Sequence, residues 1–384
     1  MLNNTNHSTL KPNTKKVCWL FCTVIDNYGD IGVSWRLAQE LHNRLNWEVH
    51  LFLDDIAALQ TILPDIPKTL PTTHRHIHIR DWCEALFANI SQAPIPHIII
   101  EAFACALPQS VHQIIQQHKP IWLNWEYLSA EDWAIRSHAM PSLQSNSSQK
   151  YFWQMGFVPQ SGGLLREQNY PHTQPENIMQ PETQIFAFGY QSPIWAEWAK
   201  VWANQATPIT LRTAGEQIIS SLKQQNIIPK DSQATEHQIG SLKIIKQSFV
   251  PQDQFDSLLQ QNHINIIRGE DSFIRAQYAA QPFIWHIYPQ EENAHLDKLD
   301  AYWQTYWQHV PPANFQAALT ALSNELNNGE TLSETQRSQH WATLFAQINQ
   351  WRSSTQTWQR YLFEQSDTVT RLQEWLDKII INSK

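Results

Sequence analysis

The chain has 384 residues, a formal net charge of -8 and a pI near 6.1. Hydrophobic residues make up 42% and charged residues 16% of it, which excludes a disordered chain and allows sizeable cores. The acidic balance argues against nucleic-acid binding, which needs a basic stripe or patch, and no apolar run approaches the ~20 residues that span a bilayer. At ~150 residues per domain, the length predicts two domains.

The N-terminal segment gives the first expectation along the chain. Residues 1–16 are polar and contain no apolar export signal, so we expect a polar leader on a cytoplasmic protein. The four cysteines lack paired CxxC spacing, and therefore neither a zinc site nor a disulfide framework is expected.

Strand and helix patterns alternate through the first half. Short apolar runs predict buried strands over 17–25, 48–54, 74–82, 97–103 and 120–128. Helical patterns lie between them, over 32–45, over 57–63 and from residue 108. This βαβ alternation predicts a parallel, doubly wound sheet over residues 17–165.

The alternation stops and then restarts. Residues 166–183 contain three prolines and little periodicity, which is typical of a linker. A second α/β domain is predicted over 184–355, with strands over 185–190, 207–213, 241–250, 264–268 and 282–289. The tail from Ala294 is helical in pattern, and its last part, 356–384, forms a separate C-terminal helix. Two such domains create a cleft, and their ligands bind beyond the carboxyl ends of the strands.

The sharpest motif follows the first strand, where Asp26 and Asp30 lie four residues apart and flank Asn27, Tyr28 and Gly29. A helix dipole favours an ionised carboxylate at Asp30, which could hold a cationic or hydroxyl acceptor and take its proton. The spacing alone favours the simpler interpretation, in which Asp30 caps the helix and Asp26 is a turn residue.

A second motif joins the strand over 264–268 to the next helix. Gly269 makes the turn after Arg268, and Glu270, Asp271 and Ser272 open the helix. Free N–H groups at a helix N-terminus can bind pyrophosphate, Arg268 could add a charge, and the acids suit sugar hydroxyls. Capping by Asp271 or Ser272 is the alternative.

Aromatic and glycine-rich segments supply weaker candidates. Phe188, Tyr190 and Phe255 lie where a planar base could stack, although rings at such positions more often belong to the core. Gly162 and Gly163 could form a loop that touches substrate, or only a tight turn; Gly32, near the first motif, is a further substrate-loop candidate.

Four segments together resemble the protein-arginine rhamnosyltransferases of elongation factor P, the EarP family. They are DNYGDIGVSWRLA, the WxNxEYLSAEDW stretch from Trp122, SGGLLRE and RGEDSFIRAQ, and the similarity runs from about Val17 to the C-terminus. The resemblance implies a GT-B glycosyltransferase fold: two Rossmann-like domains face a cleft, and C-terminal helices cross back to the N-terminal domain.

The resemblance also implies an activity and a site. It implies transfer of L-rhamnose from dTDP-β-L-rhamnose to an arginine of elongation factor P. The transfer would invert the anomeric carbon and need neither metal nor cofactor. The modified factor would be active on polyproline-stalled ribosomes. Asp30 would be the catalytic aspartate, acting as a base, with Asp26 as its companion acid, and the N-terminal domain would meet the protein acceptor. The donor-binding residues would be Phe188, Tyr190, Phe255, Arg268, Gly269, Glu270, Asp271 and Ser272. A GT-B enzyme with another sugar or acceptor, or a non-catalytic binder of the factor, stays an alternative.

Overall fold

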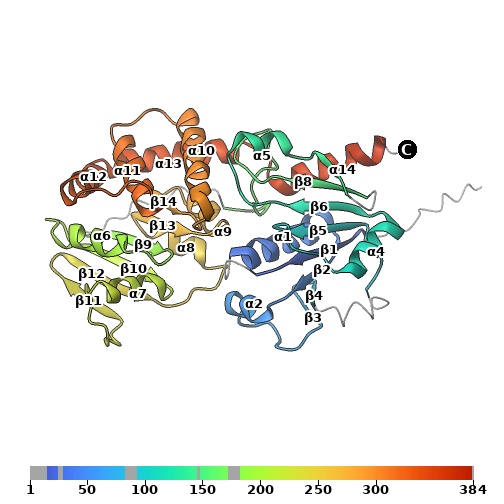
Figure 1. The fold of residues 1–384 in the computed structure, drawn as a ribbon, viewed down its shortest axis with the longest axis horizontal. Coiled ribbons are helices and arrows are strands. Elements are labelled where there is room, and N and C mark those ends of the chain that lie inside the picture. Colours follow the sequence, from blue (N-terminus) through green and yellow to red (C-terminus); the bar gives the residue numbers. More distant parts are fainter. Residues whose placement is uncertain (1–14, 25–28, 83–92, 145–147, 172–181, 383–384) are drawn as a thin grey trace, which may run out of the picture.

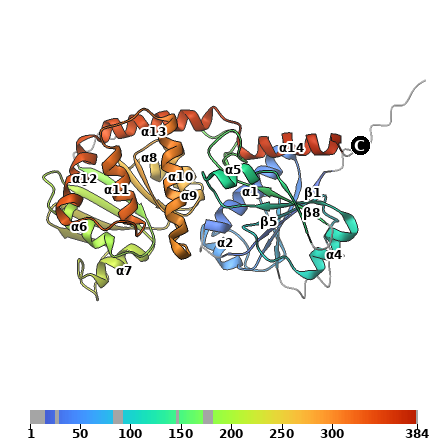
Figure 2. The ribbon, with the colours of Figure 1, turned by 45° about the horizontal axis from the view of Figure 1, so that its top comes forward.

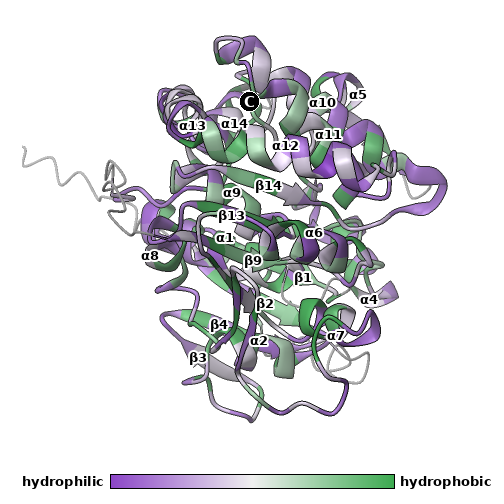
Figure 3. Cartoon of the chain, turned by 90° about the vertical axis from the view of Figure 1, so that its left-hand side faces the viewer, coloured by the Kyte–Doolittle hydropathy of each residue, from purple (hydrophilic) through white to green (hydrophobic). Residues whose placement is uncertain are grey.

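The computed structural model describes residues 15–24, 29–82, 93–144, 148–171 and 182–382. Two lobes lie side by side, and each is built around one sheet with helices on its faces (Figure 1). Hydrophobic colouring is concentrated on the central strands, whereas the outer loops are largely hydrophilic (Figure 3). The hydrophobic centre and the hydrophilic outer loops are expected where helices cover both faces of a sheet. In β1, for example, all six residues are buried.

The N-terminal lobe contains an eight-stranded sheet in the order β3-β4-β2-β1-β5-β6-β8-β7. Its inner strands are parallel, and only the edge strands β3 and β7 are antiparallel to their neighbours. The strands are β1 Val17–Cys22, β2 Glu48–Leu53, β3 Thr72–His74, β4 Ile77–Asp81, β5 Ile98–Ala102, β6 Ile121–Trp125, β7 Pro141–Leu143 and β8 Gln149–Trp153.

The C-terminal lobe contains a six-stranded sheet in the order β11-β12-β10-β9-β13-β14, parallel except for the edge strand β11. Its strands are β9 Thr183–Phe188, β10 Ile209–Ala214, β11 Glu236–Ile239, β12 Leu242–Gln247, β13 Ile264–Arg268 and β14 Phe283–His286. Because the parallel strands run in register, their carboxyl ends meet at one edge of each sheet.

Helices connect the strands and form the C-terminal tail. In the first lobe they are α1 Gly29–Leu45, α2 Ile56–Ile62, α4 Gln109–His118 and α5 Asp132–Ser137. In the second they are α6 Ile194–Ala203, α7 Gln217–Gln224, α8 Phe255–Gln260 and α9 Asp271–Tyr278. The tail consists of the short η2 Glu291–Asn293, α10 Ala294–His309, α11 Gln316–Leu326, α12 Glu334–Ala346, α13 Ile348–Phe363 and α14 Thr368–Asn382.

The fold class expected from the sequence is confirmed, with differences at the sheet edges. The run over 74–82 is not one strand, because Arg75 and His76 adopt positive φ and turn the chain between β3 and β4. The strands β7, β8 and β11 were not predicted. They are short or polar, with half-exposed or exposed residues, so they lack the apolar signature of buried strands.

The last two helices connect the lobes a second time. α13 runs along the C-terminal lobe, and α14 continues over the N-terminal lobe (Figure 2). There Trp375 packs against Trp153 of β8, and Asp367 forms an ion pair with Arg44 of α1. Within the described residues, no helix has the length and apolar character needed to cross a membrane.

The two connections between the lobes are bonded to each other. Arg166, in the first connection, donates to the Leu362 carbonyl at 3.2 Å and to the Gln365 carbonyl at 3.0 Å. The Thr368 amide donates to the Leu164 carbonyl at 2.9 Å. The chain therefore passes between the lobes at one place, as two adjacent segments.

Candidate active site

Asp30 lies in the first turn of α1, directly after the segment that follows β1. Its side chain is buried, with 3% of the residue exposed, and it lies close enough to Glu270 to raise the pKa of that carboxyl. The helix dipole favours a negative charge at this position. A buried acid of the N-terminal lobe thus faces an acid of the C-terminal lobe.

The amino end of α9 lies opposite. Gly269 has a φ of 71°, a conformation that glycine adopts without strain, and it turns the chain from β13 into the helix. The residue before the helix, Glu270, makes no side-chain capping bond to the first N–H groups. Both carboxylate oxygens of Asp271, the first residue of the helix, accept hydrogen bonds from Arg36. An uncapped helix N-terminus of this kind can bind an anion.

Two cavities lie between these elements. The first, of about 300 Å³, is lined by Gly29, Gly32, Phe188, Phe255, Arg268 and Ser272, among others. The second, of about 410 Å³, is lined by Asp30, Tyr127, Tyr190, Glu270 and Lys298, among others. Both include Gly29 and Gly269, so they adjoin at the point where α1 approaches the turn before α9.

The first cavity combines apolar and cationic walls. Phe188 and Phe255 belong to it, and Arg268 lies 4.5 Å from the Phe188 ring and 4.8 Å from the Tyr190 ring, measured from the guanidinium carbon to the ring centres. Arg268 is 6% exposed, and its Nη1 has no hydrogen-bond partner in the described part of the chain. A buried nitrogen without an acceptor suits an anionic ligand.

Glu270 belongs to the second cavity and joins both lobes. Its Oε2 accepts a hydrogen bond from the Leu128 amide at 2.7 Å, and its Oε1 accepts one from Lys298 Nζ at 2.8 Å. Burial raises the pKa of Glu270, and Asp30 raises it further, whereas Lys298 lowers it. The carboxyl is therefore held in place by the N-terminal lobe.

Sequence reasoning missed several residues at this interface. Lys298 comes from α10 and Gln252 from the loop before α8, and neither lies in a recognisable motif. Gln252 Nε2 lies 3.3 Å from both the Gly32 carbonyl and Asp271 Oδ2. Arg36 binds Asp271 from 235 positions away in the chain, a separation that no local pattern signals.

Two of the candidate glycines lie elsewhere. Gly162 and Gly163 line neither cavity; a side chain at Gly163 would meet Arg371 of α14 at 2.9 Å. Their loop receives the C-terminal helix, because Arg371 Nη1 donates to the Ser161 carbonyl at 2.7 Å. The structure thus does not bring them to the cleft. The candidates Asp26, Asn27 and Tyr28 lie outside the described residues.

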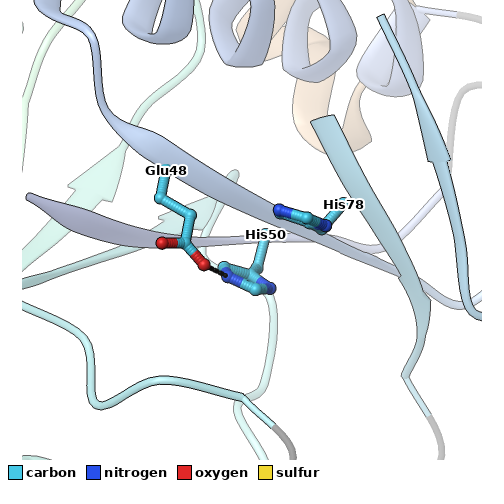
Figure 4. Close-up of side chains that lie close together, drawn as sticks. All are labelled: Glu48, His50 and His78. Atoms are coloured by element: carbon cyan, nitrogen blue, oxygen red, sulfur yellow. Dashed lines mark hydrogen bonds and ion pairs between the residues drawn. The ribbon is translucent and has the colours of Figure 1, made fainter. Parts of the chain in front are cut away.

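A group with metal-ligand chemistry lies on the neighbouring strands β2 and β4 (Figure 4). It consists of Glu48, His50 and His78. Arg80 Nε donates to His50 Nδ1 at 3.0 Å, so the neutral ring carries its proton on Nε2 and donates it to Glu48 at 3.0 Å. Burial lowers the pKa of His50 to about 4, which agrees with this neutral ring. The bond from Arg80 leaves His50 no lone pair for a metal.

Two lobes of this kind, with adjoining cavities between them, make up the GT-B fold. A solved structure concerned with EarP-mediated arginine glycosylation of elongation factor P superposes with a TM-score of 0.62 at 23% identity, covering 95% of this chain and 99% of that one. The spinosyn rhamnosyltransferase SpnG superposes with a TM-score of 0.53 at 9% identity, covering 94% and 100%.

The sequence comparison is more specific than the fold. The profile of the elongation-factor P rhamnosyltransferase EarP matches residues 18–377. A protein-arginine rhamnosyltransferase of Neisseria meningitidis serogroup B is 48% identical over 94% of this chain and 97% of its own length. The chain belongs to the EarP family.

Proposed function

We propose that this enzyme transfers L-rhamnose from dTDP-β-L-rhamnose to an arginine side chain of translation elongation factor P, inverts the anomeric carbon and needs no metal ion. One observation carries the proposal: a cavity that contains aromatic rings, the amino end of α9 and a buried Arg268 nitrogen without a partner among the described residues adjoins a second cavity that contains Asp30. The product would be elongation factor P activated for polyproline-stalled ribosomes.

The first cavity suits the nucleotide part of the donor. The thymine packs against Phe188 and Phe255, and the pyrophosphate lies at the amino end of α9 near Ser272 and Arg268. The positive helix end and the guanidinium offset the developing charge of the leaving diphosphate, which is the role that a divalent cation fills in other enzymes.

The second cavity suits the sugar and the acceptor. An arginine Nη attacks the anomeric carbon of rhamnose as the bond from that carbon to the diphosphate oxygen breaks, and the Nη proton passes to the Asp30 carboxylate. Removing the proton beforehand would cost about 9 kcal/mol at pH 7, because the pKa of a free guanidinium lies far above 7. Asp30 therefore orients the guanidinium and accepts its proton as the new bond forms.

Intact-mass measurement of elongation factor P tests the proposal. Incubation with the enzyme and dTDP-β-L-rhamnose, in excess EDTA, should add one deoxyhexose to the factor. A parallel reaction with the factor's acceptor arginine replaced by lysine should add none. A mass unchanged with this donor but increased with another nucleotide sugar would overturn the donor assignment, and loss of activity in EDTA that magnesium restores would overturn the metal-independent mechanism.

A further inference from the structure

The expected donor cavity contains a charge that opposes its ligand. Asp271 lines the first cavity next to Ser272, at the helix end where the proposed function places an anionic pyrophosphate. The residue is 8% exposed, so water screens its carboxylate little. Unless a cation neutralises it, this carboxylate repels the diphosphate.

The cation comes from the other lobe. Arg36 of α1 donates from Nε to Asp271 Oδ1 at 2.9 Å and from Nη2 to Oδ2 at 3.1 Å, a two-point pair that crosses the interface between the lobes. Burial lowers the pKa of Arg36, but Asp271 and Glu167 together raise it, and the net pKa lies above its ordinary value. The guanidinium is therefore charged, and it is committed to Asp271.

A second layer holds Arg36 in this position. Glu167 accepts from Arg36 Nη1 through one oxygen and from Arg275 Nη1 at 2.6 Å through the other. Arg275 in turn binds Asp256 at 2.7 Å. Burial would raise the pKa of Glu167, but the two arginines lower it to about 2. The network contains residues of both lobes and of the first connection between them.

We propose that Arg36 is a positioning residue for the donor. It neutralises Asp271 from across the interface and so allows a diphosphate to occupy the amino end of α9. The inference rests on the proposed function, because it assumes that the donor diphosphate binds there. Its consequence is that the donor site is complete only when α1 of the N-terminal lobe lies against α9.

A thermodynamic cycle tests charge compensation directly. Affinity for dTDP is measured by calorimetry for the wild type, Arg36→Met, Asp271→Asn and the double variant. Arg36→Met should weaken binding by roughly tenfold or more, because it leaves a buried carboxylate unpaired. The double variant should bind within about threefold of Asp271→Asn, because no carboxylate remains to be neutralised.

Arg44→Met is a matched control. Arg44 lies on the same helix and forms an ion pair with Asp367 that is about as buried, with side-chain exposures of 13% and 12% against 9% and 11% for Arg36 and Asp271. That pair connects α1 to α14 and not to α9. Arg44→Met should therefore lower the Tm while dTDP affinity stays at the wild-type value.

Two results would overturn the proposal: wild-type affinity in Arg36→Met, or a double variant that binds as weakly as Arg36→Met. Arg36→Lys keeps the charge and most of the packing, so a loss as large as that of Arg36→Met would also contradict charge compensation. Inorganic pyrophosphate serves as a second probe without thymidine. If the wild type does not bind dTDP but the cycle is intact for pyrophosphate, the proposed donor is wrong and the role of Arg36 stands. If the wild type binds neither probe, both proposals are wrong.

Discussion

A single carboxylate carries the proposed proton transfer. Asp30 is buried in the second cavity and does not line the first. Asp30→Asn should therefore lower kcat by ~100-fold or more, in line with loss of a general base, while dTDP affinity stays near the wild-type value. Mass spectrometry of elongation factor P over time and calorimetry with dTDP measure the two quantities. Turnover close to that of the wild type would show that another group accepts the proton.

A different buried acid affects stability. Glu40 of α1 is 5% exposed and its Oε2 has no hydrogen-bond partner in the described structure. Burial, and then the charge of Glu167, raise the pKa of Glu40 to about 7. The folded state thus binds this proton more tightly than the unfolded state, and stability falls as pH rises from about 4.5 to about 7.

Glu40→Gln removes this titration. The variant should be more stable than the wild type at pH 8 by on the order of 1–2 kcal/mol, and the difference should disappear near pH 4.5. Denaturant unfolding at both pH values measures it. Glu374→Gln makes the same change from carboxylate to amide at an exposed position and serves as the control. A Glu40→Gln variant that is equally stabilised at both pH values would contradict the assignment.

At the scale of elements, α8 presents one wall of the first cavity. Phe255, its first residue, lines the cavity and contacts Phe186 edge-on with ring centres 6.1 Å apart. Phe255→Ala should weaken dTDP binding by ~1–3 kcal/mol, the usual size of a base–aromatic contact. Phe345→Ala, on α12 and away from the cavity, should leave affinity unchanged. Equal affinities in all three proteins would place the base elsewhere.

The elements also show how far sequence reasoning reaches. β13 was predicted with its observed bounds, because Ile264–Arg268 is a short segment with three isoleucines directly before a glycine turn. The turn and the start of α9 could be placed for the same reason. The roles of Arg36 and Lys298 could not be predicted. Each binds a site residue, Asp271 or Glu270, that lies on another element and comes near only when the chain folds.

The edge strands illustrate the opposite case. β11 alternates exposed and half-exposed residues and pairs on one side only, so its sequence carries little hydrophobic signal. None of the residues of β7, β8 and β11 lines either cavity, so missing these strands left the predicted site unchanged. Burial on two faces makes a strand recognisable, and the strands that carry the site are of this kind.

The whole molecule sets the choice of acceptor. A lone arginine discriminates poorly among proteins, so selection must come from a folded surface that docks around Asp30. We expect a short arginine peptide to be modified with much lower kcat/KM than folded elongation factor P. Parallel titrations of both acceptors with one enzyme preparation measure this. Equal kcat/KM values would mean that recognition is confined to the arginine.

Charge should influence the same step. With a net charge of -8, the enzyme suits a basic acceptor surface, and salt screens such attraction over a Debye length of about 8 Å at physiological ionic strength. Raising salt should increase KM for the folded acceptor and leave kcat nearly unchanged. Steady-state kinetics from 0.05 to about 0.5 M salt test this, with the peptide as the control.

The double connection between the lobes restricts how they can move. The segments around Arg166 and Gln365 are hydrogen-bonded side by side, so together they form one hinge. Two bodies joined along one line rotate about that line but do not slide past each other, and atoms farther from it travel farther. Opening of the cleft would therefore move α1 away from α9 by a rigid-body rotation of one lobe. An acceptor protein that contacted both lobes would stabilise their closed arrangement. Binding of one substrate would therefore tighten the pocket of the other.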